Sequence, residues 1–192
     1  MQPSPIDVYR QDLTAGAKSG VDFMCAATVL WLAIALIWRL EYSEYNKSVL
    51  TFMVGAVMLP LAWLLSRLIG TDWKMAHNPL SPLGLWLNFA QLFYFPFLIF
   101  FLSRFPEYFV MGYAIITGAH LFPYAWYYRE PGYAVAAGVI AVGAMYGGLY
   151  TTPDTRFYIP LFTAGCFLAL AGWLFARRSR WHPQLRYQPD RG

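Results

Sequence analysis

Six long apolar stretches, separated by short segments that hold nearly all of the charges, constrain the fold of this chain more than any other feature. A bilayer core about 30 Å thick is crossed by roughly 20 mostly apolar helical residues. Charged residues make up 12% of the chain, which is too few to cover a soluble globule, where the share is about 25%. We therefore predict an all-α membrane protein, a bundle of six transmembrane helices, with spans at about 17–38, 49–69, 83–103, 107–128, 132–150 and 156–176.

The distribution of Lys and Arg between alternate connections predicts the orientation, because cytoplasmic loops carry the excess of these residues. The side of the two termini would hold Arg10, Lys18, Arg67, Lys74, Arg129, Arg177, Arg178, Arg180, Arg186 and Arg191. The opposite side would hold Arg39, Lys47, Arg104 and Arg156. Ten against four places residues 1–16 and the basic tail 177–192 in the cytoplasm. The tail is expected to be disordered or to lie on anionic lipid.

Two polar stripes run along the third and fourth predicted spans. Residues spaced by three or four share one face of a helix. The third span carries Gly84, Asn88, Gln91 and Tyr94 at such spacings, and the fourth carries Tyr113, Thr117, His120, Tyr124 and Tyr127. Gln91 and His120 would each lie eight residues, roughly 12 Å, from the cytoplasmic boundary. Because a very short turn joins the two spans, we expect the stripes to face each other.

Polar side chains within a span are hypotheses for a functional site, because they are costly in hydrocarbon. The first span adds Asp22, with Lys18 one turn earlier. Pro123 would kink the fourth span beside His120, because it cannot donate to the carbonyl of Ala119. The expected cluster on the cytoplasmic side consists of His120, Gln91, Asn88, Tyr124, Thr117 and Asp22.

Two interpretations of this cluster stay open. Asn, Gln and His often join membrane helices by hydrogen bonds, so a Gln91–His120 bond would be purely structural. Lys18 and Asp22 would then form an ion pair at the interface, with the lysine reaching toward the headgroups. Alternatively, the cluster binds a ligand in a small polar pocket between the first, third and fourth spans.

Several classes of function are disfavoured by the residues that the chain lacks. His120 is the only histidine in a span, so neither a metal nor a haem site is expected, and no cofactor is predicted. Cys25 and Cys166 are interpreted as small apolar fillers. The net charge of +4 is explained by the excess of Lys and Arg in the predicted cytoplasmic segments. The bilayer rather than nucleic acid is therefore the expected partner. No acidic residue lies near the middle of a span, where ion-coupled pumps usually hold one.

The fifth predicted span contains a pair of glycines at the spacing that allows two helix backbones to approach closely. Gly143 and Gly147 form a G-x-x-x-G pattern. Packing inside the bundle and formation of a homodimer are both compatible with this pattern.

Three stretches resemble a family of small bacterial integral membrane proteins that is described only as a domain of unknown function. They are Asn78-Pro-Leu-Ser-Pro-Leu-Gly84, Asn88-Phe-Ala-Gln91 and Gly118-Ala-His-Leu-Phe-Pro-Tyr124. The resemblance implies a multi-pass protein of the bacterial cytoplasmic membrane with the region of His120 at its centre. It implies no activity.

Three functions remain as hypotheses. The first is binding or passive transport of a small neutral or amphiphilic molecule in the polar pocket. The second is a structural or accessory subunit of a larger membrane complex, which the many aromatic residues and the glycine-rich fifth span favour. The third is a lipid-active enzyme that uses His120 and Asp22 as acid and base, although no nucleophile accompanies them.

Overall fold

A computed structural model describes residues 4–181, in which all regular secondary structure is helical and no strand occurs. The α-helices are α1 (Pro5–Gly16), α2 (Val21–Ile37), α3 (Glu44–Gly55), α4 (Met58–Ile69), α5 (Ser81–Leu92), α6 (Phe95–Arg104), α7 (Phe109–Ala119), α8 (Phe122–Tyr127), α9 (Gly132–Tyr150) and α10 (Tyr158–Ala176). The 3-10 helices are η1 (Lys18–Gly20), η2 (Pro106–Tyr108) and η3 (Arg178–Trp181). The prediction of an all-helical protein is confirmed for this part of the chain.

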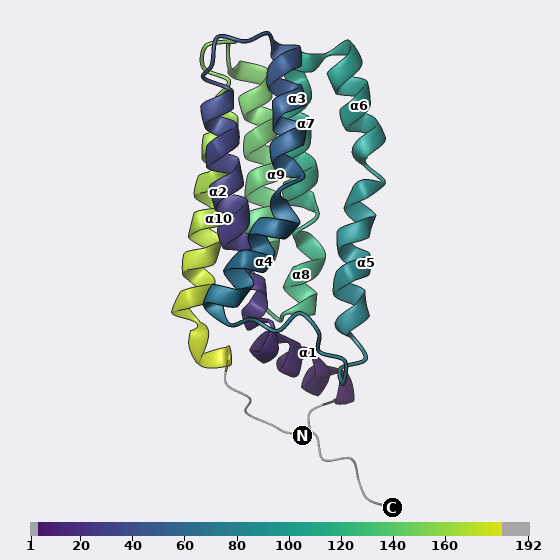
Figure 1. The fold of residues 1–192 in the computed structure, drawn as a ribbon. Coiled ribbons are helices and arrows are strands. Elements are labelled where there is room, and N and C mark those ends of the chain that lie inside the picture. The colour runs from purple at the N-terminus through teal and green to yellow at the C-terminus, as the bar shows by residue number, and fades with distance from the viewer. Residues whose placement is uncertain (1–3, 182–192) are drawn as a thin grey trace, which may run out of the picture.

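Five helical segments among the described residues are long and apolar enough to cross a membrane, so the chain is a membrane protein. They are Lys18–Ile37, Glu44–Ile69, Ser81–Arg104, Gly132–Tyr150 and Tyr158–Ala176. The predicted span 107–128 is not among them; like two of the five it is divided into two helices, here α7 and α8, which are 11 and 6 residues long. Figure 1 shows the long segments side by side, with α8 continuing the line of α7.

Three pairs of consecutive helices, α3–α4, α5–α6 and α7–α8, each form one column of the bundle with a break inside it. Each break comes shortly before a proline. Pro60, Pro96 and Pro123 lie in the first turns of α4, α6 and α8. A proline has no N–H to donate to the carbonyl four residues earlier, and its ring clashes with that carbonyl. The helix before each proline therefore ends, and a new helix begins within three residues. Figure 1 shows the three breaks within the length of the bundle rather than at its ends.

A short amphipathic helix that the sequence analysis did not assign, α1, lies across one end of the bundle (Figure 1). The hydroxyl of Thr14 donates to the carbonyl of Tyr128 at 2.8 Å, and Arg10 Nε donates to the carbonyl of Trp126 at 2.7 Å. Burial, and then the charge of Arg129, lower the pKa of the Arg10 guanidinium, which still remains charged. These bonds attach α1 to the region around α8, and we call this end of the bundle the α1 end.

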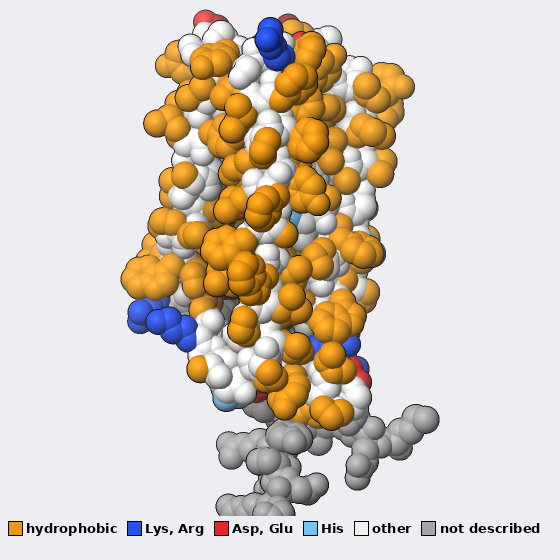
Figure 2. All heavy atoms as spheres, turned by 90° about the vertical axis from the view of Figure 1, so that its right-hand side faces the viewer, with side chains coloured by type: hydrophobic (Ala, Val, Ile, Leu, Met, Phe, Trp, Pro, Cys, Tyr) orange, Lys and Arg blue, Asp and Glu red, His pale blue; other side chains and the backbone are white. Residues whose placement is uncertain are grey.

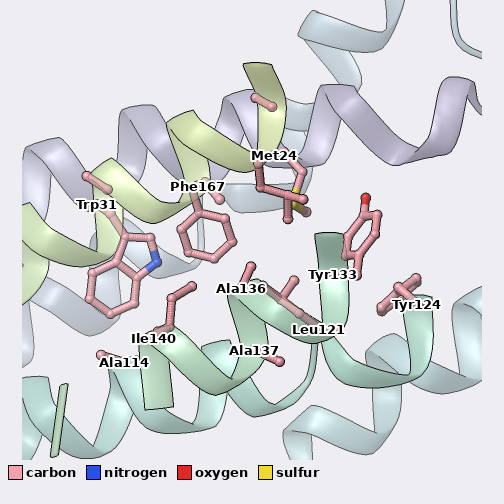
Figure 3. Packing of buried hydrophobic residues seen from close by; sticks show 14 of the residues in the cluster. Met24, Trp31, Ala114, Leu121, Tyr124, Tyr133, Ala136, Ala137, Ile140 and Phe167 are labelled. Atoms are coloured by element: carbon pink, nitrogen blue, oxygen red, sulfur yellow. The ribbon is translucent and has the colours of Figure 1, made fainter. Parts of the chain in front are cut away.

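The core lies between α2, α7, α9 and α10. Figure 3 shows the ring of Phe167, from α10, between Trp31 and Met24 of α2 and above Ile140 of α9. Phe167 is 1% exposed and Ile140 is fully buried. Dispersion contacts of this kind, rather than removal of surface from water, hold helices together when the solvent is lipid.

The surface over α5 and α6 is almost entirely apolar, and charged side chains gather at the two ends of the molecule (Figure 2). At the end opposite α1, Arg156 pairs with Glu44. At the α1 end, the buried carboxylate of Glu130 binds Arg177 at 3.0 Å and Arg180 at 2.9 Å. The first residues of the predicted basic tail are therefore ordered in η3, whereas 182–192 lie outside the described residues.

Candidate functional site

A cavity of about 540 Å³ lies on the inner side of α5, between this helix and α2, α4, α7 and α8. All six residues that the sequence predicts for a ligand site lie on its wall, namely Asp22, Asn88, Gln91, Thr117, His120 and Tyr124. The helix breaks open onto the same space, since Ala56, Leu92 and Leu121 also line it. α5 contributes to the wall but has no buried residue of its own, because the cavity separates it from the rest of the bundle.

His120 directly follows the last residue of α7, and its ring reaches α5. The Nε2 atom lies 3.3 Å from Oδ1 of Asn88, whose amide nitrogen donates to the carbonyl of Gly84 at 3.0 Å. The other ring nitrogen, Nδ1, is buried and makes no hydrogen bond within the described residues. The predicted bond between Gln91 and His120 is wrong, because the helix breaks alter the register between the two columns. Gln91 lines the cavity without a hydrogen bond in the described part of the chain.

Tyrosine hydroxyls of α8 donate hydrogen bonds to backbone carbonyls at the amino-terminal end of α5. Tyr124 donates to the carbonyl of Gly84 at 3.2 Å, and Tyr127 lies 3.4 Å from the carbonyls of Leu80 and Ser81. A Cβ atom at Gly84 would come within 2.9 Å of the Tyr127 hydroxyl, so the glycine makes this approach possible. The contacts between α5 and α8 are therefore mainly long hydrogen bonds.

An aromatic group continues from His120 toward the α1 end. Tyr124 meets the imidazole edge-on at 5.3 Å between ring centres and stacks with Tyr128 at 5.9 Å. Tyr133 packs beside both tyrosines and donates to the carbonyl of Ser19 at 2.6 Å. Thr117 bonds back to the carbonyl of Tyr113 at 2.8 Å, so its hydroxyl is already satisfied within its own helix.

Asp22 lies in the first turn of α2 and is 1% exposed. Its Oδ2 atom accepts hydrogen bonds from Thr71 at 2.9 Å and from the indole of Trp73 at 2.7 Å. The predicted Lys18–Asp22 pair is wrong, since Lys18 donates to the carbonyl of Ile69 at 2.6 Å. The reason is local: Lys18, Ser19 and Gly20 have φ of 46°, 56° and 73°. The chain is not α-helical there, so residues four apart do not share a face.

The connection between α4 and α5 closes the cavity at the α1 end. Asn78 is 2% exposed, and its amide donates to Asp12 Oδ2 at 2.7 Å and to the carbonyl of Tyr9 at 2.8 Å. His77 also lies 2.9 Å from the same Asp12 oxygen. Sequence reasoning missed this role, as well as those of Trp73 and Tyr128, because no periodic pattern marks a connection as part of a site.

The glycine pair on α9 faces α10. A Cβ at Gly143 would overlap the ring of Phe162, and one at Gly147 would come within 2.8 Å of Ile159. Both glycines thus lie at a close approach inside the bundle. In residues 4–181, no three His, Cys, Asp or Glu side chains are grouped so as to hold a metal ion.

Comparison with known proteins identifies a family. The model of a family of unknown function (DUF7010) matches residues 6–177. Neither the curated proteins nor the solved structures contain a significant match. The match extends over all ten α-helices and bears out the resemblance to a family of unknown function that the sequence indicated.

Proposed function

The chain belongs to this family of unknown function, so no relative supplies an activity, and we propose from its own geometry that it binds or passively conducts a small neutral or amphiphilic molecule in the cavity. The observation that carries the proposal is the cavity itself. Its volume of about 540 Å³ falls in the usual range for small-molecule sites of about 300–1,000 Å³, and such sites are mostly apolar with a few polar groups.

The broken helices support this proposal further. Non-helical backbone within a membrane is tolerated where it lines a cavity, and discontinuous helices form the central sites of many transporters. Three proline-associated breaks meet one cavity in this chain. The free amide of Gln91 supplies a polar group for a ligand, and the ring of His120 lines the same cavity.

A thermal-shift comparison tests the binding proposal. The full chain in a maltoside detergent would be screened with long-chain alcohols and monoacylglycerols, and a ligand at 100 times its Kd stabilises by about 2.7 kcal/mol. His120→Ala is expected to lose most of the increase in Tm. Gly138→Ala is the control, because this exposed glycine on α9 has open space around it. Identical shifts for the wild type and His120→Ala across the panel would refute the proposed site.

The membrane arrangement that accompanies this function is six spans in the bacterial cytoplasmic membrane with both termini inside. The α7–α8 column would be the sixth span, and its break is compatible with a bilayer because it faces the cavity. The α1 end holds Arg10, Lys18, Arg67, Lys74, Arg129, Arg177, Arg178 and Arg180 among the described residues, whereas the opposite end holds Arg39, Lys47, Arg104 and Arg156. This excess supports a cytoplasmic α1 end.

Cysteine labelling of intact cells tests the orientation. Asp154→Cys and Lys74→Cys would each be made in a chain that also carries Cys25→Ala and Cys166→Ala, and both positions are exposed. A membrane-impermeant maleimide is expected to label position 154 directly and position 74 only after permeabilisation. The reverse pattern would invert the orientation, and labelling of both positions from one side would exclude six spans.

The two other hypotheses predict different results. An accessory subunit would co-elute reproducibly with a larger complex in mild detergent, and the apolar outer face of α5 and α6 is the surface that such a partner would cover. A lipid-active enzyme would need His120 and Asp22 to act together. Their separate hydrogen bonds, to Asn88 and to Thr71 and Trp73, favour binding over catalysis.

A further inference from the structure

The charged residues on the wall of the cavity are all acidic. Two carboxylates line it, Asp22 deep inside and Asp72 at the exposed α1 end, and neither Lys nor Arg is among the described lining residues. The whole chain has 14 Lys and Arg and a net charge of +4. The charge on the cavity wall is therefore opposite in sign to the net charge of the chain.

Asp22 is a buried carboxylate without a cationic partner. Within residues 4–181 no Lys, Arg or His forms a salt bridge with it, and its only side-chain donors are the neutral groups of Thr71 and Trp73. Both donors reach Oδ2, so Oδ1 receives no hydrogen bond from a side chain. The amino-terminal end of α2 offers some stabilisation, but a buried charge is costly unless it is paired.

Aromatic rings surround the same region. Phe23 stacks on Trp73 with 4.9 Å between ring centres, and both rings line the cavity. Tyr128 contributes another ring, and its hydroxyl makes no hydrogen bond within the described residues. Its hydroxyl lies beside Gly20, two residues before Asp22, because a Cβ at Gly20 would come within 3.3 Å of it. Aromatic faces beside a carboxylate are the usual environment for an ammonium or quaternary ammonium group.

The part of the wall that α2 forms beyond Asp22 suits an apolar body. Beyond Asp22, α2 contributes only apolar or aromatic residues to the cavity, ending at Ile34. Twelve residues separate Asp22 from Ile34, which corresponds to about 18 Å along the helix. Phe52 and Phe95 extend the same apolar surface on the facing columns. One end of the cavity is thus acidic and aromatic, and the other end is apolar.

We propose that the ligand of this cavity is an amphiphile with a positively charged amine or quaternary ammonium head, which pairs with Asp22 while its apolar part extends toward Ile34. The assignment rests on the proposed function, since it names the class of molecule that the cavity binds.

The test compares a charged probe with a neutral probe of the same shape. Benzyltrimethylammonium and neopentylbenzene differ only in the exchange of the quaternary nitrogen for carbon. Binding of each would be measured by calorimetry and by thermal shift on the full chain in a maltoside detergent. We expect the cation to bind the wild type at least tenfold more tightly than the neutral probe.

Asp22→Asn keeps the size of the side chain and removes its charge. It is expected to reduce the preference for the cation to less than about twofold, because the paired charge is lost. Asp154→Asn is the matched control, an exposed aspartate at the opposite end of the bundle, and should leave the preference unchanged. The wild-type comparison needs no variant, so the test holds even if Asp22→Asn does not fold.

The outcomes separate the two proposals. Equal binding of both probes by the wild type would overturn the cationic assignment and leave the binding function intact. Absence of binding by either probe would overturn the cationic assignment, whereas the binding function is decided by the panel of alcohols and monoacylglycerols. A preference for the cation that survives in Asp22→Asn would also overturn the assignment, since the carboxylate would not be the group that recognises the charge.

Discussion

Replacing Phe167 with alanine is expected to lower the free energy of unfolding by about 3–5 kcal/mol, the range for truncating a fully packed aromatic side chain. The ring is 1% exposed and lies against Trp31, Met24 and Ile140 (Figure 3). Its loss would leave a void continuous with the cavity that Phe167 already lines. Denaturation of the full chain by sodium dodecyl sulfate in mixed micelles, followed by circular dichroism, would measure the change.

Phe162→Ala provides the matched control on the same helix. Phe162 is 40% exposed, on the side of α10 away from the cavity. Truncation of a side chain that is partly surrounded by detergent or lipid should cost clearly less, because only part of its contacts is with protein. An equal loss of stability in the two variants would contradict the placement of Phe167 in the core.

The apolar architecture was predictable because the bilayer imposes a simple requirement. A span needs about 20 apolar residues, and the helices that fulfil it follow from hydropathy alone. Helix α1 was not predicted, because hydropathy detects only long apolar segments. It is short and polar, and its position depends on contacts with Trp126 and Tyr128, more than a hundred residues away.

The members of the site could be named from the sequence, but their contacts could not. Helical spacing placed five residues in one region, and all five line the cavity: Asn88, Gln91, Thr117, His120 and Tyr124. Predicting which residues pair required the relative height of the two spans, and the assumption of straight helices placed Gln91 opposite His120. In the structure Asn88 rather than Gln91 contacts His120. The three residues before Val21 have positive φ, so a spacing of four does not place Lys18 on the same helical face as Asp22. Lys18 donates to the carbonyl of Ile69 instead.

Pro60 and Pro96 are sequence signals for the other two helix breaks. Each breaks its column as Pro123 does. A prediction that treated all three prolines as helix ends would have placed three breaks in adjacent columns. Since irregular backbone in a membrane must face protein or a cavity, such a prediction would have indicated the position of the cavity before its wall was known.

Gly118→Ala is expected to destabilise the chain by about 1–3 kcal/mol, the range for overpacking a filled core. A Cβ atom at this position of α7 would come within 2.6 Å of Ile140 Cγ2 and 2.8 Å of Ile140 Cβ, and Ile140 is fully buried on α9. The same substitution at Gly138 meets nothing within 4 Å, so it should be neutral or stabilise by about 0.5–1 kcal/mol through the lower entropy of the unfolded chain. Both variants would be measured by denaturation in mixed micelles. Equal stability of Gly118→Ala and Gly138→Ala would show that α7 and α9 can separate without cost, and would contradict the close contact between these two helices.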